Sequence, residues 1–326
     1  MAPEPEARVI AIDISGAYGT GVKGALVDAS ASLTAHKEAL TPHTTEGLVD
    51  TLTTMAGRLA ELSGREGVHP AAVGVAVPGL VDEAAGIVHR SPNLTLEEVR
   101  LASLIQDRVQ MPVHLVHDTS AGALAENVLG VGRGVADMLL VVVGNGVGGA
   151  AISGGRTVRG AHGSAGEIGH IMVDPAGAVC GCGGRGCLET IASEPSLLRR
   201  YTMAAGEAIT ADELIRRAMA GHPAASRVWE DALRALTIAI ASAVLVLDCE
   251  LVVLHGPGQL PSAAVAPLRT LLAKRVNLVR PPRMEVGALG QDAGVLGAAA
   301  IAFERAGMAG VTRAWRGPQT AGAGTL

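Results

Sequence analysis

The chain has 326 residues, of which 48% are hydrophobic and 17% charged, and its formal net charge is −5. This length predicts about two domains. The acidic balance and the scarcity of aromatic residues (one Phe, two Tyr and two Trp) argue against a nucleic-acid partner. Residues 1–8 carry no basic start and no apolar signal core, and the longest apolar stretch, 235–247, is too short to cross a bilayer. We therefore expect a cytoplasmic protein without a membrane segment.

The first half of the chain alternates apolar strands with helical segments. Short β-branched runs bounded by turn residues predict strands at 8–14, 21–28, 72–77 and 113–117. Apolar residues at helical spacing predict a helix at 45–63, with Thr44 or Thr45 as its N-cap, and a further helix at 121–129. The first two strands form a hairpin with a long, glycine-rich tip.

The second half repeats this plan. Strands are expected at 138–143, 147–153 and 250–254, with helices in 190–248 and a small-residue helix at 292–303. Two hairpins with glycine-rich tips, about one domain apart, indicate a duplicated architecture whose loops face each other across a cleft. From residue 307 onward, the Ala, Gly and Thr content predicts a disordered tail.

A run of three cysteines beside a histidine is the most specific motif in the chain. His170, Cys180, Cys182 and Cys187 supply the one imidazole and three thiols of a closed tetrahedral zinc site. Intervening glycines allow the tight turns that aim three sulfurs at one point. A redox pair or buried thiols in a glycine-rich loop is the alternative. Clustered thiols favour a reducing compartment, and the remote Cys249 is interpreted as a buried structural thiol.

The glycine-rich hairpin tips are candidate phosphate-binding loops. Backbone N–H groups in such tips can form an anion nest, and Asp13 at the end of the first strand could hold Mg²⁺. For each loop taken singly, an ordinary glycine-rich turn is the favoured interpretation, whereas the facing pair together with a third loop at 256–258 predicts a nucleotide cleft. The candidate nucleotide-binding residues are Asp13, Gly19, Thr20, Gly144, Asn145, Gly146, Gly256 and Gly258.

Polar residues beside the strands are candidates for chemistry on a polyol. Asp118 directly follows a buried strand and can act as a general base in phosphoryl transfer, or equally as a helix N-cap. Asn93 can donate to and accept from a polyol, although a turn-forming Asn is the default interpretation. Glu167 and Glu189 bracket the cysteine motif, and ionised carboxylates suit pairs of sugar hydroxyls. As surface residues they would be unremarkable.

These motifs together resemble the ROK family (repressor, open reading frame, kinase). The resemblance covers about residues 8–306, and its carriers are the segments 75–82, 92–94, 118–126, 144–149, 159–166, 167–189 and 292–297. It implies an α/β protein with the two-domain actin-like ATPase (ribonuclease H-like) fold and an inter-domain cleft. Residues 1–118, completed by helix 292–306, would form the small domain, and 119–291 would form the large domain with the second phosphate loop and the zinc loop.

The same resemblance implies an activity and a set of roles. The chain would be a kinase that transfers phosphate from ATP, with Mg²⁺, to a sugar or a sugar-like polyol such as an amino sugar or a cyclitol. Asp118 would be the base, and zinc would be structural. A homodimer or a dimer of dimers is expected. The residues that would contact the sugar are Asn93, His117, Glu167, His170 and Glu189.

The sequence departs from the family pattern at several points. The first phosphate loop carries about three extra residues and Tyr18, His117 replaces an Asn, Asn145 replaces a Thr, and Pro257 interrupts a glycine run. Two alternatives to the kinase are kept, and the altered first loop motivates the first of them. One is a catalytically inactive sugar-binding or regulatory protein. The other is a DNA-binding repressor, which the net charge and the roughly seven residues before the first strand disfavour.

Overall fold

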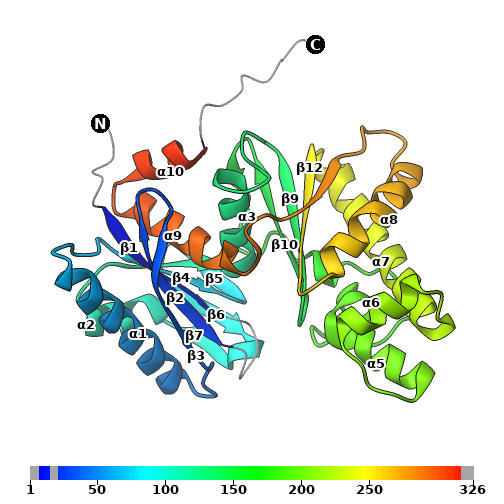
Figure 1. Ribbon diagram of the computed structural model, residues 1–326, viewed down its shortest axis with the longest axis horizontal. Helices are drawn as coiled ribbons and strands as arrows, with labels where there is room; N and C mark the ends of the chain where they lie inside the picture. The colour runs from blue at the N-terminus through cyan, green and yellow to red at the C-terminus, as the bar shows by residue number, and fades with distance from the viewer. Residues whose placement is uncertain (1–6, 15–20, 317–326) are drawn as a thin grey trace, which may run out of the picture. The chain divides into compact units, whose positions relative to one another are not determined.

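The structure is a computed structural model that describes residues 7–14 and 21–316 (Figure 1). The chain divides into two compact units. Unit 1 comprises Met1–Gly134, Arg159–Ser164 and Gln291–Leu326, within the described residues, and unit 2 comprises Val135–Val158 and Ala165–Gly290. Unit 1 is therefore assembled from both ends of the chain and one short internal segment.

The main sheet of unit 1 has five strands in the order β3-β2-β1-β4-β8. β1 pairs antiparallel with β2 and parallel with β4, β4 pairs parallel with β8, and β2 pairs antiparallel with β3. Because β1, β4 and β8 run in the same direction, their carboxyl ends meet at one edge of the sheet. The strands are β1 (Arg8–Ile14), β2 (Val22–Asp28), β3 (Leu33–Ala39), β4 (Val73–Val77) and β8 (Val113–His117).

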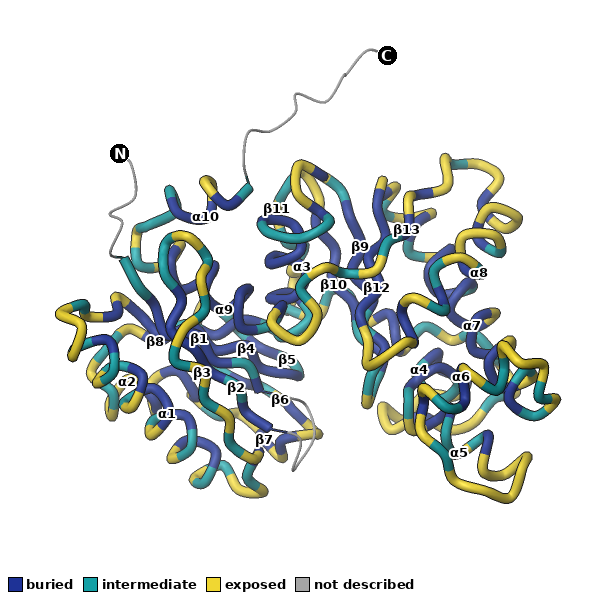
Figure 2. The backbone as a smooth tube through the Cα atoms, in the orientation of Figure 1, coloured by how far each residue is buried: buried dark blue, intermediate teal, exposed yellow. Residues whose placement is uncertain are grey.

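Helices enclose this sheet. They are α1 (Thr45–Arg65), α2 (Leu101–Val109), α3 (Asp118–Val128), α9 (Ala293–Arg305) and α10 (Ala309–Arg316). The side chain of Thr44 accepts the N–H of Gly47 and caps α1, as expected. Helix α9 packs very closely against β4, since a Cβ at Gly74 would collide with the backbone of Ala298. The small residues of α9 allow this close approach, and Figure 2 shows that the helix is largely buried.

A second, three-stranded sheet in unit 1 was not predicted. Its antiparallel strands β5 (Leu80–Asp82), β6 (Ile87–Ser91) and β7 (Leu96–Val99) are joined by tight connections. The 3₁₀ turn η1 (Pro92–Leu94) connects β6 to β7 and carries Asn93. These strands are short, and turn residues interrupt them, so their apolar runs fall below the length at which alternation identifies a strand.

Unit 2 repeats the topology of the first sheet. Its strand order β11-β10-β9-β12-β13 has the same two antiparallel and two parallel pairings. The duplicated architecture expected from the two hairpins is confirmed in each unit's topology. The strands are β9 (Met138–Val143), β10 (Val147–Ser153), β11 (Arg156–Thr157), β12 (Leu251–His255) and β13 (Arg283–Val286).

Five helices and a 3₁₀ turn complete unit 2. They are η2 (Ile168–His170), α4 (Glu189–Ala192), α5 (Glu194–Ala205), α6 (Ala211–Met219), α7 (Pro223–Leu247) and α8 (Leu260–Arg275). Helix α7 contributes a row of buried Ala, Leu and Ile side chains to the core, as its apolar sequence predicts. No helix within the described residues is both long and apolar enough to cross a membrane.

Two segments differ from the expectations. Helix α3, expected in the large domain, belongs to unit 1, where the backbone of Ala121 approaches Gly297 of α9 so closely that a Cβ would not fit. Residues 309–316, expected to be disordered, form α10. There the Trp315 indole packs edge-on against Phe303, with ring centroids 5.6 Å apart, and its N–H donates to the Ala29 carbonyl at 2.8 Å. Burial of the indole stabilises a helix that composition alone does not predict.

Candidate active site and candidate metal centre

Asp118 stands at the carboxyl end of β8 as the first residue of α3. The N-cap position belongs to His117, so Asp118 does not cap the helix in the usual sense. Its Oδ1 accepts the backbone N–H of Thr119 at 2.7 Å, while Oδ2 forms no hydrogen bond or ion pair among the described residues. The side chain is 31% exposed. One carboxylate oxygen is thus held in place and the other is available to an incoming hydroxyl.

Asp13 lies near the end of β1, on the same sheet edge as Asp118. Burial, reinforced by the negative charge of Asp118, raises the pKa of Asp13 to about 7, although Lys23 opposes the shift. Lys23 faces Asp13 in the β1–β2 register, and its Nζ donates to Gln291 Oε1 at 2.5 Å. The structure therefore brings two carboxylates together in unit 1, and such a pair suits a divalent cation.

Helix α9 closes over the Asp13 carboxylate. A Cβ built at Gly294, the second residue of α9, would lie 2.5 Å from Asp13 Cγ. Glycine is needed here because any side chain would displace the carboxylate. The candidate phosphate-loop residues Gly19 and Thr20 lie outside the described residues, and Asn93 is exposed on η1.

The second glycine-rich loop connects β9 and β10 in unit 2. The N–H of Gly144 donates to the Gly146 carbonyl at 2.8 Å, which makes a tight turn with Asn145 exposed at its tip. The N–H of Val147 donates to Glu189 Oε2 at 3.0 Å, and a Cβ at Gly146 would lie 2.5 Å from the same oxygen. Glu189 at the start of α4 therefore anchors this loop.

The third glycine-rich loop follows β12 and is exposed. Gly258 has a φ of +51°, and a side chain there would collide with the carboxylate of Asp212. Oδ1 of Asp212 accepts the N–H of Gln259 at 2.8 Å, so this carboxylate fixes the loop that carries Gly256 and Gly258. Asp212 was not identified from the sequence, because it lies 47 residues from its partner, at a helix start where a second acid, Glu213, adjoins it.

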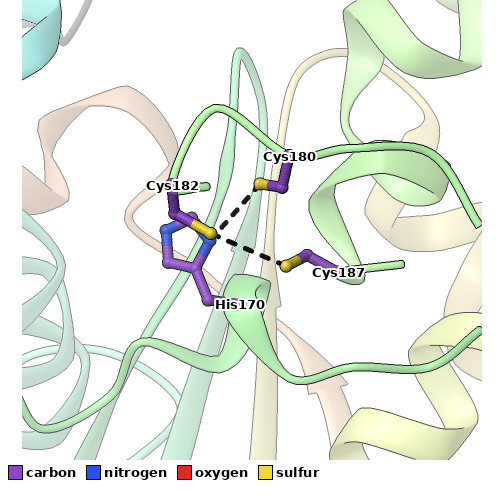
Figure 3. A group of neighbouring side chains, drawn as sticks. All are labelled: His170, Cys180, Cys182 and Cys187. Atoms are coloured by element: carbon purple, nitrogen blue, oxygen red, sulfur yellow. Dashed lines mark hydrogen bonds between the residues drawn. The ribbon is translucent and has the colours of Figure 1, made fainter. Parts of the chain in front are cut away.

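The expected metal ligands converge in unit 2 (Figure 3). One donor atom from each of His170, Cys180, Cys182 and Cys187 lies within 4.8 Å of the others. The Cys182 and Cys187 sulfurs are 3.7 Å apart, and Cys180 Sγ is 3.7 Å from His170 Nδ1. Zinc–sulfur bonds of about 2.3 Å at a tetrahedral angle place two sulfurs roughly 3.8 Å apart. The donor set therefore fits a tetrahedral zinc ion, and the separation excludes a disulfide.

The local backbone explains how the thiols converge. Cys180 and Cys187 are buried, whereas Cys182 is exposed at the tip of a tight turn closed by a bond from Cys180 N–H to the Gly184 carbonyl. Burial raises the pKa of Cys180 and raises that of Cys187 to about 12. The N–H of Gly184 donates to Cys182 Sγ and lowers the pKa of Cys182. Metal binding must therefore displace protons from the two buried thiols.

His170 links this cluster to a carboxylate. Its Nδ1 faces Cys180, and its Nε2 lies 3.7 Å from Glu167 Oε2. A metal-bound histidine commonly directs its second nitrogen at such an outer group, which fixes the orientation of the ring. The cluster, Glu167 and Glu189 all lie in one stretch of 23 residues, which is why the sequence alone could group them.

Three residues that contact the candidate groups were not anticipated. Glu83 Oε1 accepts the N–H of His117 at 3.3 Å, and Thr119 Oγ1 lies 3.0 Å from His117 Nδ1. Asp212, described above, is the third. Glu83 is distant in sequence from His117, so only its position in the acidic pair at the end of β5 could have drawn attention to it.

The comparisons with known proteins agree on one family. The protein-family model described as "ROK family" matches residues 9–305 of the chain. An N-acetylmannosamine kinase from Escherichia fergusonii is 32% identical over 302 residues, which cover 90% of this chain and 97% of that protein. A candidate xylose repressor from a Caldicellulosiruptor species is 32% identical over 245 residues, and the match spans 70% of this chain but 61% of that longer relative.

A solved structure gives the same result for the fold. A ROK family glucokinase from Streptomyces griseus, in complex with glucose and AMPPNP, superposes with a TM-score of 0.78 at 28% identity. The match covers 91% of this chain and 100% of that one. The actin-like ATPase fold expected from the sequence is thereby confirmed.

Proposed function

The chain belongs to the ROK family, and from this membership we propose that it is an ATP-dependent sugar kinase in which Asp118 is the general base. The observation that carries the proposal is the state of the Asp118 carboxylate. Its Oδ1 is held by the Thr119 N–H, and its Oδ2 has no partner among the described residues. A carboxylate oriented in this way can accept the proton of a sugar hydroxyl as that hydroxyl attacks the γ-phosphoryl group of ATP.

Nucleotide binding is assigned to the glycine-rich loops and to Asp13. The tips at 144–146 and 256–258 would offer backbone N–H groups to phosphates and to the nucleoside, as would Gly19 and Thr20 in the first loop. Asp13, with Asp118 beside it, fits Mg²⁺, which supplies neutralisation of phosphate charge when bound. The raised pKa of Asp13 supports this assignment, because a crowded carboxylate gains from a cation.

Sugar binding is assigned to Asn93, Glu167, His170 and Glu189. Carboxylates and an imidazole offer acceptors and donors for neighbouring hydroxyls. The substrate class is a hexose or an N-acetylated amino sugar, since the relatives are named for glucose and N-acetylmannosamine. Zinc held by His170 and the three cysteines would be structural, because four protein ligands leave no position for a reactive water.

We also propose that the protein is a cytoplasmic homodimer. This rests on the family resemblance and on a thiol cluster that needs a reducing compartment to stay free for metal. Light scattering on the purified protein measures the assembly directly. A monomer at micromolar concentration would contradict the dimer without affecting the assignment of the activity.

The proposed function is tested by ADP release from ATP and Mg²⁺ with glucose and N-acetylmannosamine, then with other hexoses and cyclitols. We expect turnover with one sugar class and a loss of at least about 100-fold in Asp118→Asn. Sugar affinity of Asp118→Asn, measured by calorimetry, should stay within a few-fold of the parent value. Sugar-dependent thermal stabilisation with no ADP from any sugar would instead establish a sugar-binding regulatory protein on the same fold.

A further inference from the structure

The environment of His117 gives this residue a role different from sugar binding. Its Nε2 lies 3.3 Å from Asp118 Oδ1, and its Nδ1 lies 3.0 Å from Thr119 Oγ1. An imidazole has only these two polar atoms. Both already lie within hydrogen-bond distance of groups of the chain, so the ring has no remaining nitrogen with which to bind a sugar hydroxyl.

The backbone of His117 is also fixed. Its N–H donates to Glu83 Oε1 at 3.3 Å, and the Glu83 side chain is only 8% exposed. The other Glu83 oxygen lies 2.8 Å from Nε of Arg159, so the buried carboxylate is paired with a cation. A buried, paired carboxylate of this kind restrains the residue it bonds. The imidazole therefore extends from a held position toward Asp118.

We propose that His117 is a positioning residue, which directs an Nε2–H at Asp118 Oδ1 and so leaves Oδ2 as the single oxygen that takes the substrate proton. Charge favours a hydrogen on Nε2, because a bare nitrogen lone pair facing a carboxylate oxygen would be repelled by it. Oδ1 then has two neighbours that restrain it, the Thr119 N–H at 2.7 Å and the imidazole at 3.3 Å. The inference rests on the proposed role of Asp118 as the base.

The consequence concerns geometry rather than affinity. Partial rotation of the Asp118 carboxylate about its Cβ–Cγ bond would move the basic oxygen away from the sugar hydroxyl. Two donors on one oxygen oppose that rotation. Misplacement of a catalytic atom by about 1 Å can cost roughly 100-fold in rate while leaving ground-state binding intact.

Substitutions at position 117 separate positioning from binding. In His117→Ala we expect kcat for the sugar that is turned over to fall about 10- to 100-fold, with the equilibrium Kd for that sugar within twofold. In His117→Gln the amide nitrogen lies as many bonds from Cβ as Nε2 does, so kcat should recover to within about fivefold of the parent. His36→Gln, at an exposed position on β3, is the matched control.

A spectroscopic measurement tests the same contact without turnover. Long-range ¹H–¹⁵N spectra of the ¹⁵N-labelled full chain, with the His117 signals assigned by their loss in His117→Gln, should show hydrogen on Nε2. In Asp118→Asn that signal should shift, whereas the signals of His36 should not.

The outcomes distinguish this inference from the proposed function. A neutral ring with hydrogen on Nδ1 alone, or a His117→Ala variant with parental kcat and a sugar Kd raised tenfold or more, overturns the positioning role. An absence of ADP release with every sugar overturns the kinase assignment, and the spectra then decide the His117–Asp118 contact by themselves.

Discussion

The Glu189 carboxylate accepts the backbone N–H of Val147 at 3.0 Å, and Glu189 follows the zinc-ligand candidate Cys187 by two residues. One short segment thus joins the metal cluster to the β9–β10 loop that is assigned to ATP. If the Glu189 carboxylate also binds the sugar, as proposed, then loss of the metal would weaken the binding of both the sugar and ATP. This link lies wholly within unit 2.

Substitution of Glu189 should separate its two roles. Glu189→Gln keeps an acceptor for the Val147 N–H but removes the charge, so we expect weaker sugar binding by about 3- to 10-fold with nucleotide affinity unchanged. Glu189→Ala removes the acceptor as well, and nucleotide affinity should fall by a similar factor. Calorimetric titration of each ligand provides the measurement, and Glu230→Ala, an exposed acid on α7, is the control. Equal nucleotide affinity in both variants would show that the loop does not depend on Glu189.

Removal of one thiol should abolish zinc binding and weaken sugar binding. In Cys182→Ser we expect loss of bound zinc and, because the loop that carries Glu167 and Glu189 is no longer held, a drop in sugar affinity of at least about tenfold. Elemental analysis with sugar titration measures both quantities. Cys249→Ser changes a cysteine outside the cluster and should retain one zinc per chain. Normal sugar binding by a zinc-free Cys182→Ser protein would show that the metal does not support the sugar-binding residues.

The sequence predicted those parts of the site whose residues are close together in the chain. His170 and the cysteines span 18 residues, and their ligand chemistry alone identified the cluster that the structure brings together. Asp118 and Asp13 were singled out because strand ends could be read from apolar runs. Two contacts join residues far apart in the chain. Glu83 and His117 are 34 positions apart, and Trp315 and Ala29 are 286 positions apart. Local periodicity carries no information on such pairs, so helix α10 and the support of His117 came only from the structure.

The raised pKa of Asp13 makes stability depend on pH. The folded protein holds this proton more tightly than the unfolded chain does, so stability is lost as pH rises from the ordinary value of 3.8 to about 7. We expect Asp13→Asn to be more stable than the parent at pH 8, by the order of 1 kcal/mol or more, and to lose this advantage near pH 4. Urea denaturation at both pH values measures the difference.

Asp28 provides a control of opposite sign. Burial opposes ionisation of Asp28, but hydrogen bonds from Ser30 and Ser32 outweigh it and hold the pKa of Asp28 below its usual value. Its ionised form therefore stabilises the fold at neutral pH, and that contribution is lost as pH falls through the lowered pKa. Asp28→Asn should accordingly be less stable than the parent at pH 8. A stabilised Asp28→Asn, or an Asp13→Asn variant whose relative stability does not change with pH, would contradict the assigned environments.

Gly294 and Gly57 distinguish packing at the site from helix propensity. Both are helical glycines, and replacement of an exposed helical Gly by Ala typically stabilises a protein by up to about 1 kcal/mol. Gly57 in α1 has nothing within 4 Å of an added Cβ, so Gly57→Ala should gain this stability and keep full activity.

At Gly294 the new methyl group would lie 2.5 Å from Asp13 Cγ, and the carboxylate must move. We expect Gly294→Ala to lose at least about tenfold in kcat, because Asp13 is assigned to the cation that neutralises the transferred phosphate. Steady-state kinetics and urea denaturation on the two variants measure both effects, and a Gly294→Ala enzyme as active as Gly57→Ala would separate Asp13 from catalysis.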